Sequence, residues 1–421
     1  MGYLGMTKKA RQLKVKSLVD EKDRSKQYVS LSFSLIYETD VTIYRREADG
    51  FIFDYDSEEY FDEMSYLEAE VIFSGRPDIK HSYAYYRDYD IELDKVYVYW
   101  VSTKLSGDKI TGPVAVKTRN ADIWWHYDRI MSHMYEIENK YENACVMQFG
   151  ESVEHRAISG IIVGNRNNII ACIGAIHAGE SGPEISLSVL ENILENEPEL
   201  LQSVGIAVLP VVNADMREAM AEGIPWYLRT NKNGVDLNRN FDMDWEQVSE
   251  DYGLCTADPN SVTYRGVYAQ SEPETKATVK FVKQVNPGII LAYHSLSGIA
   301  GDRMICSEYA KTDRQYGERF EKLARVYSDA FRIAADMKPR EEKNLELSGM
   351  AGSFPAWCYK NGFLGTDLEL AMGENLDCFG VCRDDKVTPE ILDYCIKLHT
   401  AGTIALMKHL SVYNETEKIN E

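Results

Sequence analysis

Residues 169–180 read IIACIGAIHAGE, an apolar run that ends in a histidine, His177, and a glutamate, Glu180. A short continuous apolar run bounded by polar residues is typical of a strand buried on both faces of a sheet. Further strand-like runs lie at 205–212 and 288–293. They alternate with segments of helical apolar spacing at 184–194 and 273–282. This alternation predicts an α/β fold, an open and mostly parallel sheet with helices on both faces. In such sheets the functional groups lie beyond the carboxyl ends of the strands.

The chain before residue 120 has a different pattern. Residues 29–35, VSLSFSL, alternate with the period of two that marks a half-buried strand. Similar segments follow at 41–44, 69–73, 95–101 and 112–116. They predict a small all-β sandwich of the immunoglobulin or fibronectin III type over 27–120, followed by an α/β domain over 121–421. We interpret the sandwich as a spacer or as a docking surface, either for a partner or for a second copy of the chain.

Charge and cysteine usage restrict the class of protein. The formal net charge of −21 disfavours binding to nucleic acid or to anionic membranes. Residues 1–26 carry eight basic against three acidic residues and predict a basic arm. No apolar run long enough for a signal peptide or a membrane span is seen, so membrane insertion is not expected. The eight cysteines lack C-x-x-C spacing and suggest reduced thiols and a cytoplasmic location.

Two further strand-like runs carry ionisable residues at their ends. His294 follows the run at 288–293, and Glu369 lies in the apolar segment 366–370, TDLEL. Taken singly, each feature has an ordinary structural explanation: a capping carboxylate, a core histidine, or a buried ion pair. Together with His177 and Glu180, they place imidazole and carboxylate groups at one edge of the predicted sheet. Such N and O donors suit zinc.

A long polar segment, 229–242, connects these strands and reads RTNKNGVDLNRNFD. Taken together, the ordered residues resemble the zinc carboxypeptidase family, whose signature runs H-x-x-E, an arginine before D-x-N-R-N, then H-S and a late E-L. The resemblance covers about residues 122–410. Two flanking stretches are also similar to family motifs: 150–158, GESVEHRAI, and 268–275, YAQSEPET. Residues 352–357, GSFPAW, resemble bacterial members that cut peptidoglycan stem peptides.

The resemblance implies one Zn²⁺ per chain, with a fourth coordination position open for water and three ligands: His177, Glu180 and His294. It implies that Glu369 acts as general base and that Arg229 polarises the scissile carbonyl. Asn238 and Arg239 match the pair that binds the substrate's terminal carboxylate. The expected reaction is hydrolysis of a peptide bond next to a free carboxylate by zinc-activated water.

Some positions depart from the animal digestive members. Their mobile tyrosine would fall near Leu347, where no tyrosine stands, and their arginine between the first two ligands is Gly179. A glycine-rich stretch after Leu347 has the composition of a lid. Residues 353–355 contain no aspartate, so a preference for C-terminal Lys or Arg is not expected.

Three other readings compete with a metallocarboxypeptidase. The first is a peptidoglycan γ-D-glutamyl-diaminopimelate peptidase, whose substrate is a peptidoglycan fragment rather than an ordinary peptide. The second is a deacylase of N-acyl amino acids, which would share the H-x-x-E and D-x-N-R pattern. The third is a non-catalytic binding protein on the same scaffold, which would be expected to have lost a ligand or the base.

Overall fold

The computed structural model describes residues 13–35, 39–48, 58–103, 110–247, 256–295, 301–369 and 387–412. The chain divides into two compact units. The smaller comprises Met1–Trp124 with Glu218–Tyr227, and the larger comprises Trp125–Arg217 with Leu228–Glu421. The limits 27–120 and 121–421 that the sequence suggests stay predictions.

The smaller unit contains two four-stranded antiparallel sheets, in the orders β1-β2-β6-β5 and β4-β3-β7-β8. Its elements are β1 (Leu13–Val19), β2 (Gln27–Ser34), β3 (Val41–Glu47), α2 (Glu58–Asp62), a 3-10 turn (Tyr66–Glu68), β4 (Glu70–Gly75), β5 (Asp78–Lys80), β6 (Tyr83–Asp88), β7 (Val96–Thr103) and β8 (Ile110–Lys117). One apolar core draws on both sheets, with Leu31 and Phe33 from β2 beside Ile43 from β3 and Tyr99 from β7. The predicted small β domain is thereby confirmed.

Residues 13–19 correct the prediction of a solvated basic arm over 1–26. They form β1, which pairs antiparallel with β2 from Leu13 opposite Phe33 to Val19 opposite Gln27. The sequence LKVKS alternates, with Leu13 buried and Lys14 exposed. The lysines occupy only the exposed positions of the strand. The high content of basic residues therefore suggested a basic arm, although the alternation of a strand with period two is present. Residues 1–12 lie outside the described part of the chain.

The larger unit is built on an eight-stranded mixed sheet in the order β15-β14-β16-β13-β11-β12-β10-β9. Its strands are β9 (Ala144–Glu151), β10 (Ala157–Val163), β11 (Ile169–Ile173), β12 (Gly205–Leu209), β13 (Ile289–His294), β14 (Met304–Ser307), β15 (Leu345–Ser348) and β16 (Gly365–Glu369). The four central strands β16, β13, β11 and β12 run parallel. Burial on both faces explains their continuous apolar sequences.

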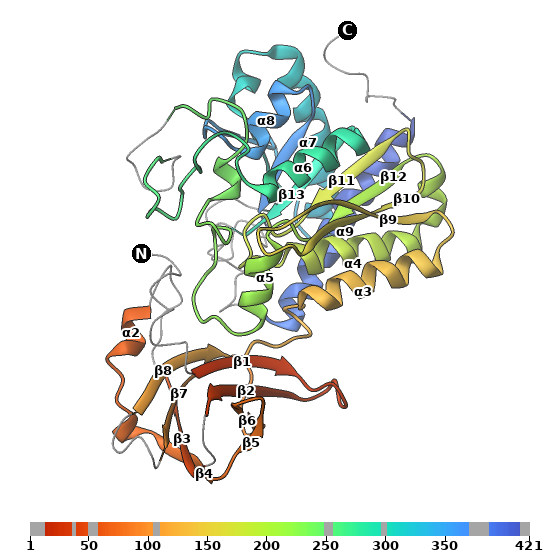
Figure 1. Ribbon diagram of the computed structural model, residues 1–421. Coiled ribbons are helices and arrows are strands. Elements are labelled where there is room, and N and C mark those ends of the chain that lie inside the picture. The colour runs from red at the N-terminus through yellow and green to blue at the C-terminus, as the bar shows by residue number, and fades with distance from the viewer. Residues whose placement is uncertain are drawn as a thin grey trace. The chain divides into compact units, whose positions relative to one another are not determined.

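Helices cover both faces of this sheet, as expected (Figure 1). They are α3 (Tyr127–Lys140), α4 (Gly182–Asn196), α6 (Pro273–Val285), α7 (Arg314–Ala334), α8 (Phe354–Lys360) and α9 (Pro389–Val412), with 3-10 turns at Pro198–Gln202, Leu237–Arg239 and Glu308–Lys311. A further helix, α5 (Ala214–Ala221), begins in the larger unit and ends in residues of the smaller one. α6 and α8 share one core with the sheet. α4 and α3 lie on the opposite face, where α4 also packs on α9. None of the helices in the described ranges has the length and apolar composition that crossing a bilayer requires.

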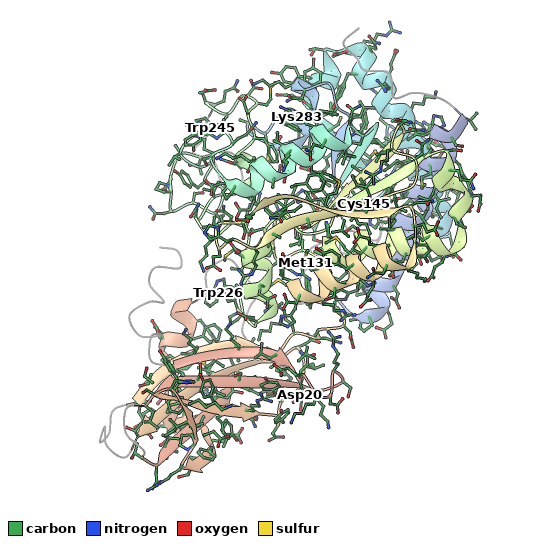
Figure 2. The ribbon with its side chains drawn as sticks, turned by 45° about the vertical axis from the view of Figure 1, so that its right-hand side comes forward. Asp20, Met131, Cys145, Trp226, Trp245 and Lys283 are labelled. Carbon is green, nitrogen blue, oxygen red and sulfur yellow. The ribbon has the colours of Figure 1, made fainter. Side chains whose placement is uncertain are left out.

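Side chains fill the space between these layers (Figure 2). Lys283 of α6 has its ammonium 6.0 Å from the ring centroid of Trp357 on α8, so the two helices meet through a cation–π contact. The sequence patterns did not predict α7, β14 or β15. α7 packs on α9, where Tyr327 Oη and His399 Nδ1 lie 2.6 Å apart.

Candidate metal centre and active site

The three central strands β11, β13 and β16 place the candidate residues at one edge of the sheet. His294 is the last residue of β13, and its register partner is Glu369, the last residue of β16. β11 runs parallel to β13, and the chain continues from it into His177 and Glu180. Because parallel strands end at a common edge, residues more than a hundred positions apart meet there.

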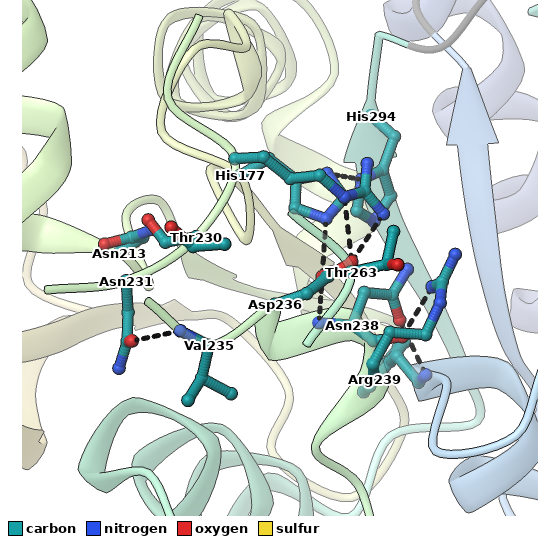
Figure 3. A network of polar contacts seen from close by, with 12 residues as sticks. His177, Asn213, Thr230, Asn231, Val235, Asp236, Asn238, Arg239, Thr263 and His294 are labelled. Atoms are coloured by element: carbon teal, nitrogen blue, oxygen red, sulfur yellow. Dashed lines mark hydrogen bonds and ion pairs between the residues drawn. The ribbon is translucent and has the colours of Figure 1, made fainter. Parts of the chain in front are cut away.

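His177, Glu180 and His294 form a buried cluster, and Figure 3 shows the two histidines of this cluster close together. The Nδ1 atoms of the two histidines are 3.2 Å apart. Glu180 Oε1 is 3.1 Å from His177 Nδ1, and Glu180 Oε2 is 3.1 Å from His294 Nδ1. The residues are 0%, 0% and 1% exposed, in that order. Nitrogen and oxygen atoms that carry lone pairs thus face one another in a space that excludes bulk water.

This donor set fits a zinc ion. With Zn–N bonds of about 2.0–2.1 Å and tetrahedral angles, two ligand atoms are separated by roughly 3.3 Å. The separations of 3.1 and 3.2 Å in the cluster are close to that value. Lone pairs on the two imidazoles and the carboxylate repel one another unless a proton or a metal cation lies between them. Among the described residues, this is the one group of three histidine, cysteine or acidic side chains arranged to hold a metal.

The charges within the cluster reinforce one another. Burial alone would raise the pKa of the Glu180 carboxyl, but His177 and His294 beside it hold that pKa well below its ordinary value. Burial would likewise lower the pKa of His294, whereas Asp367 and Glu180 hold it well above. An ionised, buried carboxylate is costly without a cation nearby, so Glu180 is held in the form that binds a metal.

Asp236 connects the cluster to the polar segment and has no assigned role in the sequence-based prediction. Its Oδ1 lies 3.2 Å from His177 Nε2, and its Oδ2 accepts a hydrogen bond from Arg229 Nε at 2.8 Å and forms an ion pair with Arg229 Nη2 at 2.7 Å. Its Oδ1 also accepts from the Asn238 backbone N–H at 3.0 Å and so caps the 3-10 turn Leu237–Arg239. Burial would raise the pKa of Asp236, but the charge of Arg229 holds it far below its usual range.

Asn238 and Arg239 lie on that turn, and both are buried. The Asn238 side chain donates to Asp367 Oδ2 at 3.0 Å and accepts from the Phe354 backbone N–H at 2.8 Å. Arg239 donates to the Asn238 carbonyl oxygen at 2.7 Å. A close approach fixes this turn, because a Cβ on Gly352, which has φ +66°, would collide with the Arg239 carbonyl oxygen. The 352–357 stretch that resembles bacterial members therefore contacts the candidate substrate-binding residues directly.

All seven residues predicted from the sequence lie in the larger unit, and each is buried. The structure brings together His177, Glu180 and His294, and it pairs Glu369 with His294 in the sheet register. Leu347 lies on β15 and is 39% exposed. Residues 345–348 are thus part of the sheet, and the glycine-rich stretch that suggests a lid begins after them.

Two acidic residues of the site, Asp236 and Asp367, are missing from the predicted set. A signal for each exists in the sequence. Asp236 stands inside the D-x-N-R-N pattern, two positions before Asn238, and Asp367 stands two positions before Glu369. In a strand, residues two apart share a face, so Asp367 belongs on the same side of β16 as Glu369.

Comparisons with known proteins point to one family. The sequence model of the zinc carboxypeptidase family (peptidase M14) matches residues 130–388. The chain is 30% identical over 238 residues to the catalytic chain of carboxypeptidase N from Homo sapiens, covering 48% of this chain and 51% of that protein. Bovine thrombin-activatable fibrinolysis inhibitor, solved in complex with tick carboxypeptidase inhibitor, aligns with a TM-score of 0.57 at 20% identity, covering 69% of this chain and 98% of that one. Carboxypeptidase A from Helicoverpa armigera aligns at 0.53 and 15%, covering 89% and 99%.

The chain belongs to the zinc carboxypeptidase family. The family is one of zinc-dependent metallopeptidases that act on peptides, and the His177, Glu180 and His294 cluster of this chain is suited to metal binding. The structural alignments, at these low identities, establish the fold of the larger unit. The chain spans about half the length of the curated relatives it matches.

Proposed function

We propose that the chain is a zinc metallocarboxypeptidase that hydrolyses a peptide bond next to a free carboxylate. The observation that carries this proposal is the convergence of His177, Glu180 and His294 with Glu369 beside them. Glu369 and His294 are register partners, and neighbouring strands lie about 4.8 Å apart. A carboxylate at that position is suited to exchange protons with a water at the metal.

Each residue has a distinct task in this proposal. A zinc ion held by the cluster would supply Lewis-acid polarisation of a water and of the scissile carbonyl. Glu369 takes a proton from the attacking water and hands it to the leaving amine. Its 2% exposure keeps competing solvent away from that proton. A general base so placed contributes about 10²–10⁴-fold to the rate.

The two arginines supply positive charge for the substrate. Arg229 is held by Asp236 at 2.8 Å, which fixes its guanidinium before the substrate arrives. We assign it to the developing negative charge on the carbonyl oxygen. Arg239, together with the Asn238 amide, is assigned to the terminal carboxylate, because the planar guanidinium matches a carboxylate in two hydrogen bonds.

The test is digestion of a peptide library read by mass spectrometry, with zinc and with a chelator. We expect products shortened at the C-terminus, about one zinc per chain, and loss of cleavage on chelation. His177→Ala should lose both zinc and cleavage. His155→Asn is the matched control, because His155 has an 84% exposed side chain and a left-handed backbone that Asn tolerates. Full activity after complete metal removal would contradict the proposal.

A second candidate, a peptidoglycan γ-D-glutamyl-diaminopimelate peptidase, is favoured by one contact. The Phe354 backbone of the GSFPAW stretch donates to Asn238 Oδ1, so the residues that resemble the bacterial members adjoin the candidate carboxylate-binding turn. Parallel digestion of a muropeptide and of a linear peptide with a free C-terminus separates the two substrates. Preferred cleavage of the muropeptide would assign the second function.

We also propose a cytoplasmic location. The cysteines of the described ranges are all free thiols: Cys145, Cys172, Cys306, Cys358 and Cys395. Free thiols persist in a reducing compartment. Fractionation of the source cells, with the protein followed by antibody, tests this directly, and recovery outside the cytoplasm would contradict it.

A further inference from the structure

Each histidine of the cluster has a carboxylate behind its second ring nitrogen. His177 Nε2 faces Asp236, and His294 Nε2 faces Asp367 Oδ1 at 3.4 Å. In contrast to the first pair, the second forms no hydrogen bond of good geometry. Both His294 Nε2 and Asp367 Oδ1 are buried and have no hydrogen-bond partner among the described residues. A buried polar atom without a partner is costly, and here a donor and an acceptor that complement one another are 3.4 Å apart.

The other oxygen of Asp367 is already committed. Asp367 Oδ2 accepts a hydrogen bond of 3.0 Å from Asn238 Nδ2. Asp367 is 9% exposed and stands on β16 two residues before Glu369, so that both side chains lie on the same face of the strand. One carboxylate thus lies between a candidate zinc ligand and a candidate substrate-binding residue.

We propose that Asp367 is a positioning residue that holds both His294 and Asn238, and this rests on the proposed zinc peptidase function. Through Oδ1 it keeps the His294 proton on Nε2, which leaves the Nδ1 lone pair directed at Glu180 and His177. Through Oδ2 it fixes the Asn238 amide on the 3-10 turn. A carboxylate that accepts a hydrogen bond from the other ring nitrogen of a metal-binding histidine orients the ring and raises its basicity.

Only a carboxylate serves both neighbours. Asn238 Nδ2 is a donor, and a His294 ring that binds metal through Nδ1 is a donor at Nε2. An ionised carboxylate accepts at both oxygens. An asparagine offers one acceptor and one donor, so in either orientation its NH₂ group faces another donor. Asp367→Asn therefore keeps the shape of the side chain and loses one of the two contacts.

A merely structural role for Asp367 makes a different prediction. Asp302 provides the matched control, since it is also a buried aspartate. It accepts hydrogen bonds from Arg340 Nε at 2.6 Å and from Ser328 at 3.0 Å, and neither of these residues belongs to the cluster. Loss of its charge in Asp302→Asn should lower the unfolding temperature and leave the zinc affinity unchanged. The same result for Asp367→Asn would reduce that residue to a fold-stabilising group.

The experiment compares the full-length wild type, Asp367→Asn and Asp302→Asn. Zinc affinity is measured by competition with a chromophoric chelator, and KM and kcat are measured with one cleaved peptide. We expect Asp367→Asn to bind zinc about 10–100-fold more weakly, or to raise KM by a similar factor if the amide turns its NH₂ toward Asn238. Zinc affinity and KM both within twofold of the wild type would overturn the inference.

A second measurement uses the wild type and therefore does not depend on whether a variant folds. In zinc-loaded wild type labelled with ¹⁵N-histidine, NMR should show His294 protonated at Nε2 and metal-bound through Nδ1. A His294 Nε2 that is unprotonated or metal-bound overturns the inference. If the wild type binds no zinc, the proposed function itself fails. If the wild type binds zinc but Asp367→Asn changes neither zinc affinity nor KM, the proposed function stands and the positioning role of Asp367 is contradicted.

Discussion

Asp236 joins His177 to Arg229. One of its oxygens lies 3.2 Å from the histidine Nε2, and the other accepts a hydrogen bond of 2.8 Å from the arginine Nε. The metal ligation proposed for His177 and the charge stabilisation proposed for Arg229 therefore depend on the same buried carboxylate.

Replacement of Asp236 by Asn should weaken both functions. We expect zinc affinity to fall about 10–100-fold, because the His177 ring loses the acceptor that fixes its proton. We also expect the metal-free protein to lose about 3–5 kcal/mol of unfolding free energy, since the change breaks the buried ion pair between Asp236 and Arg229. Chelator competition and urea unfolding measure the two effects. Asp242→Asn, at a side chain with 56% exposure, is the control and should change stability by less than about 0.5 kcal/mol.

Replacement of Glu369 by Gln should abolish turnover while leaving the metal in place. The amide cannot accept the proton of the attacking water, so kcat should fall about 10²–10⁴-fold. Zinc content, measured by atomic emission, should equal that of the wild type. Glu346→Gln on β15, whose carboxylate pairs with Arg303, is the control and should keep wild-type kcat. A Glu369→Gln enzyme with more than a third of the activity would exclude Glu369 as the base.

The stability of the larger unit should depend on pH through Glu274. Burial raises the pKa of this carboxyl to about 7 from 4.5, although Asn231 donates to it at 3.0 Å. The folded chain then binds the proton more tightly than the unfolded chain. Stability from this group is complete below about pH 4.5 and is lost as the pH rises toward 7, a change of about 3 kcal/mol.

Glu274→Gln removes that titration. We expect the unfolding free energy of the variant minus that of the wild type to increase by about 3 kcal/mol between pH 4.5 and pH 8, because only the wild type loses stability over this range. Urea unfolding at a series of pH values measures the difference. An unfolding free-energy difference that is constant across this range would show that Glu274 does not titrate within it.

The start of β16 should not tolerate a side chain at Gly365. A Cβ there would lie 2.7 Å from Cys358 Cβ and would collide with its sulfur. Because β16 carries Asp367 and Glu369, Gly365→Ala should cost about 1–3 kcal/mol of stability and also reduce kcat. Adding Cys358→Ala removes the sulfur and should recover part of both losses. Strict additivity of the two changes would contradict a direct clash.

Much of the architecture could be predicted from local sequence. The apolar runs 169–176 and 288–293 contain most of the strands β11 and β13, and 184–194 lies within α4. Prediction failed where composition obscured periodicity, as in β1, where lysines alternate with buried positions. It also missed Asp236 and Asp367, because their contacts with His177 and His294 join residues that are distant in sequence and are known only from the folded chain.

The order of the motifs along the chain determined the family, the kinds of side chain available for zinc, and the strand ends at which they stand. Those features are local, since they follow from apolar periodicity and from residues a few positions apart. Only the folded sheet decided which groups meet, as with His294 and His177, 117 positions apart, and Asn238 and Asp367, 129 apart. Such contacts depend on which strands lie side by side, and that order is fixed by the packing of helices on both faces of the sheet.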